Sequence, residues 1–392
     1  MEDQIREFGS LLELTDALDK EGITGLQYRQ IMENFLLRKS RMKGRPYCAS
    51  FELTPLCNFN CKMCYVHDNN AEGELSAEEW IKLGKEAADA GMVFLLLTGG
   101  EPLCRSDFKE IYLGLKKLGL LISINTNGSL IDREYVEFFK ENPPLRINIS
   151  LYGCSDSTYK DLCRNESFEK VTRNIAALKE AGIQVKINSS ITPDNACDIE
   201  GIYKFGESLD IPVKATTYMF PPVRINGQQY GEAPARLSAK KAAEYMLLCR
   251  EQYMTPEQLA SAWVGDPMSD ELDCTDGQGE HMNCRAGKTA FWVTWDGRMT
   301  PCGMFPIEGW SVKSKGFSEA WKNVREYCAS LVLPVKCKSC NYKTRCPSCA
   351  AACLAETGDT SRLPEYVCEM TAYLEKLTHE KYKKGDAENE NK

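Results

Sequence analysis

Apolar residues recur with two different periods between residues 49 and 218. Stretches in which every second residue is apolar are typical of strands, whereas apolar residues three or four positions apart are typical of helices. Helical segments separate the predicted strands, and this alternation predicts an α/β fold with parallel strands and right-handed crossovers. The predicted strands cover residues 49–54, 92–97, 121–126, 145–151, 183–190 and 213–218.

The helix between the first two strands has the clearest limits. Ser76 and Glu79 form a capping-box pattern, and Trp80 and Leu83 begin an apolar face that ends near Gly91. A helix is therefore predicted between Ser76 and Gly91.

One face of the later strands is polar. It carries Asn148 and Ser150 on the fourth strand and Lys186 and Asn188 on the fifth. A closed parallel barrel fills its interior with Val, Ile and Leu, so a polar interior predicts a partial (β/α)6 TIM-like barrel that holds a polar ligand. An open sheet with one solvated face is disfavoured, because parallel sheets are normally covered on both sides.

The remaining chain is organised around this core. A length of 392 residues exceeds the usual single domain. We predict a helical N-terminal extension at residues 1–45, the barrel core at 46–230, a helical linker at 231–283, a small cysteine-rich domain at 284–380 and a disordered tail at 381–392.

Composition narrows the class of protein. The chain has 19 cysteines, which in a reducing compartment indicate metal ligation rather than disulfides. Its net charge of -8 argues against a large nucleic-acid surface, and no apolar run is long enough to predict a membrane span. The N-terminus lacks a signal-peptide pattern, so we expect a cytoplasmic protein.

Cys57, Cys61 and Cys64 form the first group of candidate ligands. They follow the first predicted strand directly, and a loop can place three such thiols on one face of an iron-sulfur cluster. Since each iron normally takes one thiolate, three thiolates leave one iron open to a small molecule. A zinc site completed by His67 or by a distant cysteine is the alternative.

Gly99, Gly100 and Glu101 follow the second predicted strand. Two glycines allow a ligand to approach the backbone closely, and a carboxylate beside them can bind an ammonium group. Ligands of α/β folds bind at the carboxyl ends of the strands, so this segment is a candidate binding site.

The three-cysteine loop and the Gly-Gly-Glu-Pro segment together resemble the radical S-adenosylmethionine (SAM) superfamily. The resemblance implies that Cys57, Cys61 and Cys64 hold a [4Fe-4S] cluster that binds S-adenosylmethionine. It implies that Gly99, Gly100 and Glu101 meet the methionine ammonium. Met63 occupies a position where relatives often have an aromatic residue near the adenine.

Three further positions resemble those that bind the ribose or the carboxylate in relatives: Ser150, Arg164 and Asn188. Each is explained equally well as filler of the barrel interior or as a surface side chain.

A second field of cysteines begins at Cys284. The pair Asp296-Gly297 predicts a hairpin between Cys284 and Cys302. The field also contains Cys337, Cys340, Cys346, Cys349, Cys353 and Cys368. This density indicates one or two metal centres, and zinc remains an alternative.

This field resembles the SPASM extension of radical SAM enzymes that modify peptides, and the resemblance implies two auxiliary [4Fe-4S] clusters. The commoner pattern has a cysteine at the position of Ala350, whereas this chain has Cys349. The resemblance assigns Cys337, Cys340, Cys346 and Cys368 to an outer cluster. It assigns Cys284, Cys302 and Cys349 to an inner cluster, with Cys274 or Cys353 as a further ligand or with a position open to a substrate sulfur.

The resemblance also implies the reaction. We expect a 5′-deoxyadenosyl radical, a ribosomally synthesised precursor peptide as substrate, an oxidative crosslink such as a thioether, and a reductant such as ferredoxin or flavodoxin. No catalytic base is identified. The alternatives are peptide epimerisation, a non-catalytic metal-binding or electron-carrier protein, and formylglycine formation as in anaerobic sulfatase maturation. The last is disfavoured because Gly303 stands where those relatives have an acid.

Overall fold

The computed structural model describes residues 11–20, 25–66, 70–222, 233, 235–261, 284–342 and 346–383. In this part of the chain, one sheet has the strand order β6-β5-β4-β3-β2-β1-β7-β8-β9. Its strands are β1 (Cys48–Glu52), β2 (Phe94–Thr98), β3 (Leu121–Thr126), β4 (Arg146–Ser150), β5 (Val185–Ser190), β6 (Val213–Thr216), β7 (Ala290–Val293), β8 (Arg298–Thr300) and β9 (Trp310–Ser311).

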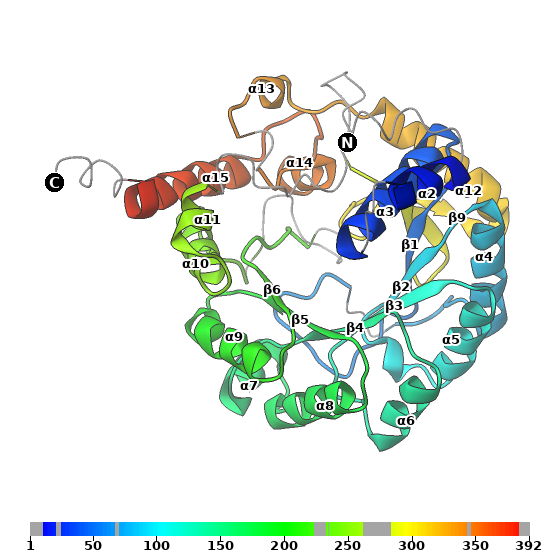
Figure 1. The fold of residues 1–392 in the computed structure, drawn as a ribbon, viewed down its shortest axis with the longest axis horizontal. Helices are drawn as coiled ribbons and strands as arrows, with labels where there is room; N and C mark the ends of the chain where they lie inside the picture. The colour runs from blue at the N-terminus through cyan, green and yellow to red at the C-terminus, as the bar shows by residue number, and fades with distance from the viewer. Residues whose placement is uncertain are drawn as a thin grey trace.

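Strands β1 to β6 are parallel throughout, and each overlaps a strand predicted from the sequence. No pairing joins β6 to β9 among the described residues, so the barrel is incomplete, as predicted. Helices form a ring on the outer side of the curved sheet (Figure 1). The α/β partial barrel inferred from the sequence is confirmed.

The helices that follow the first five strands and surround the barrel are α4 (Ala77–Ala90), α5 (Phe108–Lys117), α6 (Arg133–Glu141), α7 (Asp156–Cys163), α8 (Phe168–Glu180) and α9 (Ile199–Ser208), with short 3-10 turns η1 (Pro102–Cys104) and η2 (Ala196–Asp198). The other helices are α2 (Leu11–Lys20), α3 (Gly25–Met42), α10 (Ala239–Glu251), α11 (Pro256–Ser261), α12 (Val312–Ser330), α13 (Val335–Lys338), α14 (Ala350–Thr357), α15 (Glu365–Thr378) and the π-helical turn η3 (His379–Lys383).

Helix α4 begins and ends as the sequence predicts. Ser76 accepts a hydrogen bond from the Glu79 N–H, and the Glu79 carboxylate accepts one from the Ser76 N–H. Gly91 ends the helix with φ 118°, in the region where a side chain would be strained. The buried residues of α4 include Trp80 and Leu83, which lie on the predicted apolar face.

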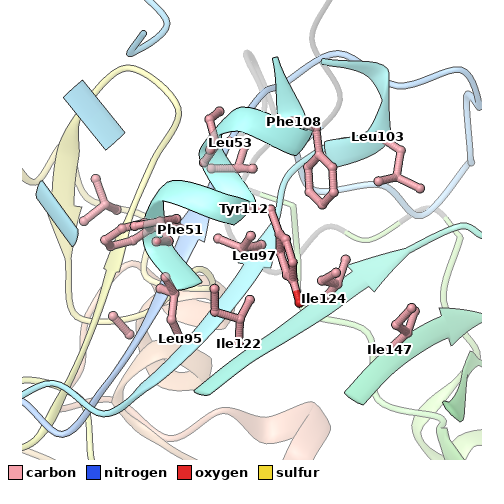
Figure 2. Packing of buried hydrophobic residues seen from close by; sticks show 14 of the residues in the cluster. Phe51, Leu53, Leu95, Leu97, Leu103, Phe108, Tyr112, Ile122, Ile124 and Ile147 are labelled. Atoms are coloured by element: carbon pink, nitrogen blue, oxygen red, sulfur yellow. The ribbon is translucent and has the colours of Figure 1, made fainter. Parts of the chain in front are cut away.

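The core lies between the outer face of the sheet and this ring of helices. Phe51, Leu97 and Ile124 from the strands pack against Phe108 and Tyr112 of α5 (Figure 2). Each is fully buried, so replacing Phe51 with alanine should cost about 3 to 5 kcal/mol of unfolding free energy. This packed layer fixes the strands and so fixes the loops that follow them.

Strand β7 is the element that sequence patterns did not place correctly. It pairs in parallel with β1 while forming the predicted hairpin with β8. Trp292 of β7 donates a hydrogen bond from Nε1 to Glu52 of β1 over 2.9 Å. The sheet therefore continues past residue 284, where the sequence suggested a separate domain to begin, and the domain limits remain predictions.

The described part of the predicted N-terminal extension consists of α2 and α3. Leu14 and Leu18 of α2 form a small buried cluster with Ile31 and Phe35 of α3. At the other end of the chain, the predicted disordered tail falls largely outside the described residues. No helix in the described ranges is long and apolar enough to cross a membrane.

Candidate active site

The three-cysteine loop lies at the carboxyl end of β1. The N–H of Phe59 donates to Cys57 Sγ at 3.4 Å, and the N–H of Val66 donates to Cys64 Sγ at 3.5 Å. The loop is also held by α7, because the Asn60 N–H donates to the Cys163 carbonyl at 3.1 Å. The sulfurs of the loop are thus presented by a backbone that is fixed on two sides.

Cys57, Cys61 and Cys64 all line one cavity. Burial raises the pKa of the Cys57 thiol to about 12. A hydrogen bond with the Cys163 thiol, together with burial, raises the pKa of Cys61 well above its usual value. Binding of a metal by these cysteines must therefore release their thiol protons, as ligation of iron by thiolates does.

Three free thiols on one cavity wall fit a cluster with one open iron. Within the described residues, no group of three or more His, Cys, Asp or Glu side chains is arranged to hold a single metal ion. His67, which was considered as a zinc ligand, lies outside the described residues.

The Gly-Gly segment packs directly against the start of this loop. Gly100 donates its N–H to the Thr54 carbonyl at 2.7 Å, and Glu101 donates its N–H to the Leu56 carbonyl at 2.8 Å. A Cβ atom on Gly100 would lie 2.3 Å from the Leu56 carbonyl oxygen. Only glycine allows this approach, and both glycines also line the cavity.

Glu101 lies behind the cavity wall, at the ends of β2 and β3. Its carboxylate is fully buried and accepts hydrogen bonds from Asn127 N–H at 2.7 Å, Thr126 Oγ1 at 2.8 Å and Leu103 N–H at 3.0 Å. The cavity wall includes Gly99 and Gly100 but not Glu101. This carboxylate joins the ends of β2 and β3, and burial raises its pKa to about 7.

Asn127 contributes to the site from the end of β3, where the pattern Thr126-Asn127-Gly128 by itself predicts only a turn. Its Nδ2 donates to Asn58 Oδ1 at 2.8 Å and lies 3.9 Å from Cys57 Sγ. Asn58 in turn donates to Ser129 Oγ at 2.8 Å. The only sequence indication was the strand-end pattern Thr-Asn-Gly, which does not reveal a contact with a residue 70 positions earlier.

Arg105 is a second residue whose role the sequence did not indicate. Its guanidinium donates to the Leu53 carbonyl at 2.9 Å and the Leu75 carbonyl at 3.0 Å, and it pairs with Glu74 at 3.2 Å. Its hydrogen bonds to Asp107 lower the pKa of that carboxyl. Arg105 therefore ties the end of β1 to the segment before α4.

The cavity occupies the polar interior of the barrel and has a volume of about 960 Å³. The predicted binding residues Met63, Ser150 and Asn188 all lie on its wall, as do Asn125 and Asn148. Asn148 donates to Asn125 over 2.8 Å, so neighbouring strands satisfy one another's polar side chains. The predicted polar interior is confirmed.

Arg164 does not lie on this wall. It is an exposed residue that ends α7 in the left-handed conformation, with φ 57°. Its described position therefore does not support contact with a ligand in the cavity.

The thiols assigned to the outer cluster lie near one another. Electrostatic interaction with Cys346, Cys337 and Cys340 adds to burial in raising the pKa of Cys368 to about 11. Cys346 and Cys340 likewise add to burial in raising the pKa of Cys337. The fold thus brings residues from α13, the loop before α14, and α15 into one group, whose part in metal binding remains a proposal.

The thiols assigned to the inner cluster form a second group. Burial, with Cys349 and Cys284 nearby, raises the pKa of Cys302 to about 12. Cys353 is buried and interacts with members of both groups, while Cys274 lies outside the described residues. Cys328 of α12, which the sequence gave no reason to choose, interacts with Cys284 and Cys302.

Three free thiols on the wall of a polar cavity inside a partial barrel are the arrangement expected of enzymes that bind a small molecule at an iron-sulfur cluster. Residues 51–206 match the Radical SAM superfamily. The chain is a radical SAM enzyme, and this class uses a [4Fe-4S] cluster and S-adenosylmethionine.

Known proteins resemble the chain over most of its length. The AdoMet-dependent heme synthase of Methanosarcina barkeri is 26% identical over 335 residues, which cover 81% of this chain and 95% of that protein. Streptococcus suis SuiB bound to its precursor peptide SuiA has a TM-score of 0.65 at 17% identity, covering 88% of this chain and 81% of SuiB. The structure of native anSMEcpe with bound AdoMet and Cp18Cys peptide also has a TM-score of 0.65. It is 18% identical and covers 86% of this chain and 99% of the anSMEcpe chain. These two structures share the fold.

Proposed function

We propose that this enzyme oxidises a ribosomally synthesised peptide and forms a thioether between a cysteine sulfur and a carbon atom. One observation carries the proposal: a single cavity extends from the thiols of the three-cysteine loop to Met304 and Pro347. Met304 follows Cys302 by two residues, and Pro347 lies between Cys346 and Cys349. A substrate in this cavity would face both the radical-generating site and the second field of thiols.

The proposed cofactors would act at opposite ends of this cavity, one forming the radical and the other accepting an electron. When bound, the first cluster and S-adenosylmethionine supply a 5′-deoxyadenosyl radical that takes one hydrogen atom, and an auxiliary cluster supplies an acceptor for one electron. The second substrate hydrogen leaves the thiol as a proton, so the product is two hydrogens lighter than the substrate.

The protein's own residues position the reactants. Gly99 and Gly100 offer close backbone approach for the methionine end of S-adenosylmethionine, and Ser150 and Asn188 offer hydrogen bonds deeper in the barrel. Asn127 and Glu101 hold the loop ends in register. The wall also contains Tyr152 and other apolar side chains that limit water access to the radical.

A peptide is favoured as substrate because two proteins with this fold have been crystallised with peptides, SuiB with SuiA and anSMEcpe with Cp18Cys. The fold similarity supports the proposal by analogy only. A cytosolic reductant such as ferredoxin or flavodoxin would supply the electron that starts each turnover.

The experiment uses anaerobically reconstituted protein, a reductant and a cysteine-containing peptide encoded beside the gene. Formation of 5′-deoxyadenosine and a peptide two hydrogens lighter would support the thioether. Recovery of the cysteine as a free, alkylatable thiol in that product would contradict it. An unchanged mass with one inverted stereocentre would favour epimerisation.

A haem-related substrate is the second candidate. It is favoured by the 26% identity with the M. barkeri heme synthase, which extends over 95% of that protein. Incubation with iron coproporphyrin III in place of peptide tests it, because a change in the mass of the porphyrin would select this function over peptide modification.

Formylglycine formation remains disfavoured. The residue after Cys302 is Gly303, and a Cβ there would lie 2.8 Å from the Trp292 ring, so the position cannot carry an acid without rearrangement. The non-catalytic alternative is excluded, because the chain is a radical SAM enzyme.

A further inference from the structure

The side-chain amide of Asn127 belongs to a closed ring of hydrogen bonds beside Cys57. Its Oδ1 accepts two hydrogen bonds from Ser129, one from the backbone N–H at 2.9 Å and one from Oγ at 2.7 Å. Its Nδ2 donates to Asn58 Oδ1 at 2.8 Å. Asn58 closes the ring, because its Nδ2 donates to Ser129 Oγ at 2.8 Å.

This ring fixes which end of the Asn127 amide faces the cysteine loop. A backbone N–H can only donate, so the atom bound by the Ser129 N–H must be the oxygen, and the opposite atom must be the nitrogen. One of the two Nδ2 hydrogens is taken by Asn58 Oδ1. The other is left for Cys57 Sγ, which lies 3.9 Å from Nδ2.

The turn after β3 does not need this nitrogen. The turn is held by the Asn127 oxygen through Ser129, and by the Asn127 N–H, which donates to Glu101 at 2.7 Å. An aspartate would supply the same acceptor in the same kind of turn. The amide nitrogen is therefore the part of Asn127 that serves the cysteine loop.

The surroundings make one donor important. Asn127 is 9% exposed and Ser129 is 2% exposed, so the ring is shielded from water. A hydrogen bond is electrostatically stronger in such a place than in water. Cys57 Sγ also accepts the Phe59 N–H at 3.4 Å, so two neutral N–H groups point at this sulfur.

We propose that Asn127 is a positioning residue that donates an N–H···S hydrogen bond to Cys57 and thereby raises the reduction potential of the first cluster. One electron arrives from the external reductant, and no bond is made or broken. The added negative charge is shared by the cysteine sulfurs, and a hydrogen bond to a sulfur stabilises it. The inference rests on the class of enzyme alone, so it applies to a peptide and to a tetrapyrrole substrate equally.

The first test measures the potential directly. The anaerobically reconstituted full chain is titrated with Ti(III) citrate, and reduction is followed by EPR. The signal that changes when S-adenosylmethionine is added identifies the first cluster. We expect a more negative midpoint potential in Asn127→Ala than in the wild type, and a still more negative one in Asn127→Asp, because the carboxylate adds a charge. A wild-type potential in both variants would overturn the proposal.

Ser129→Ala is the matched control for a purely structural role. It removes one hydroxyl from the same ring but keeps the backbone N–H that holds the Asn127 oxygen, so the Nδ2 donor stays in place. We expect its Tm to fall, as in Asn127→Ala, while its potential remains that of the wild type. An equal shift in potential in Ser129→Ala and Asn127→Ala would assign the effect to the turn and refute the proposal.

The second test needs no substitution at Asn127, so it remains decisive if those variants fail to fold. Asparagine with ¹⁵N in its side-chain amide is incorporated into the wild type and into Asn58→Ala, which removes the other amide of the ring. Pulsed EPR of the reduced proteins, without S-adenosylmethionine, should show a weak ¹⁵N coupling in both. Absence of the coupling from both proteins would contradict the hydrogen bond. Neither test requires product, so failure of peptide crosslinking would leave both interpretable.

Discussion

The backbone N–H of Gly100 donates a hydrogen bond to the carbonyl oxygen of Thr54 over 2.7 Å. This contact places the segment after β2 against the segment after β1, three residues before Cys57. The proposed methionine-binding backbone and the proposed cluster loop are therefore parts of one rigid unit. A substitution in either segment should therefore alter the structure of the other.

Replacing Gly100 with alanine should disturb both parts. The new Cβ would lie 2.3 Å from the Leu56 carbonyl oxygen and 2.6 Å from that of Pro55, so the cysteine loop must move. We expect S-adenosylmethionine binding to fall at least tenfold, which corresponds to about 1.4 kcal/mol, together with reduced iron content. Equilibrium dialysis and iron analysis measure the two effects.

Gly182→Ala is the matched control for this substitution. Gly182 has φ 79° and open space around its Cβ position, so alanine there strains the backbone without touching the site. The control should lose some stability but retain cofactor binding and iron. Equal cofactor affinity in Gly100→Ala and the wild type would contradict the coupling.

The double variant Cys337→Ala, Cys340→Ala tests the outer thiol group. We expect about four fewer irons per chain and loss of peptide product, while some S-adenosylmethionine cleavage remains, because the first cluster is held by a separate loop. Cys197→Ala is the control, since its exposed thiol belongs to neither group. Full peptide turnover in the double variant would refute the proposed role of these residues.

The ion pair of Arg236 and Glu356 should stabilise the junction between the barrel and the C-terminal region. Glu356 is bound by Arg236 at 2.6 Å and by the hydroxyl of Tyr218, at the end of the barrel, at 2.9 Å. The two charged side chains are only 13% and 5% exposed, so Glu356→Gln should cost about 3 to 5 kcal/mol. Thermal unfolding measures this loss.

The control for this ion pair is Lys322→Gln, which breaks the exposed pair between Lys322 and Glu326. A surface pair of this kind contributes about 0 to 1 kcal/mol, so the control should unfold close to the wild type. A Glu356→Gln protein as stable as the control would show that Tyr218 and Arg236 do not depend on this carboxylate.

The pH dependence of stability should report on Glu101. Burial raises its pKa from 4.5 to about 7, so the folded protein holds this proton more tightly than the unfolded chain. The resulting stabilisation is complete below pH 4.5 and is lost as the pH rises to about 7. The wild-type Tm minus that of Glu101→Gln should therefore decrease from pH 5 to about 7 and then level off. A difference that increases with pH would mean that the three hydrogen bonds hold the carboxylate in its charged form.

Local patterns predicted the barrel well because its elements obey local rules. Ser76 and Glu79 cap their helix through contacts within one turn, and the alternation around Asn148 and Asn188 reflects which face of a strand is covered. The position of β7 could not be predicted in this way. Its pairing with β1 joins residues about 240 positions apart, and no local rule selects that partner.

The sequence by itself determined the class of enzyme, because the loop from Cys57 to Cys64 and the Gly-Gly-Glu-Pro segment at residues 99–102 are each short, contiguous motifs. It also determined which strand faces are polar. Only the tertiary structure decided that Glu101 is buried between two strand ends and that Asn127 reaches Cys57. The physical reason is that strand register and curvature, which arise from packing of the whole core, bring distant side chains together, whereas the chain encodes only their order.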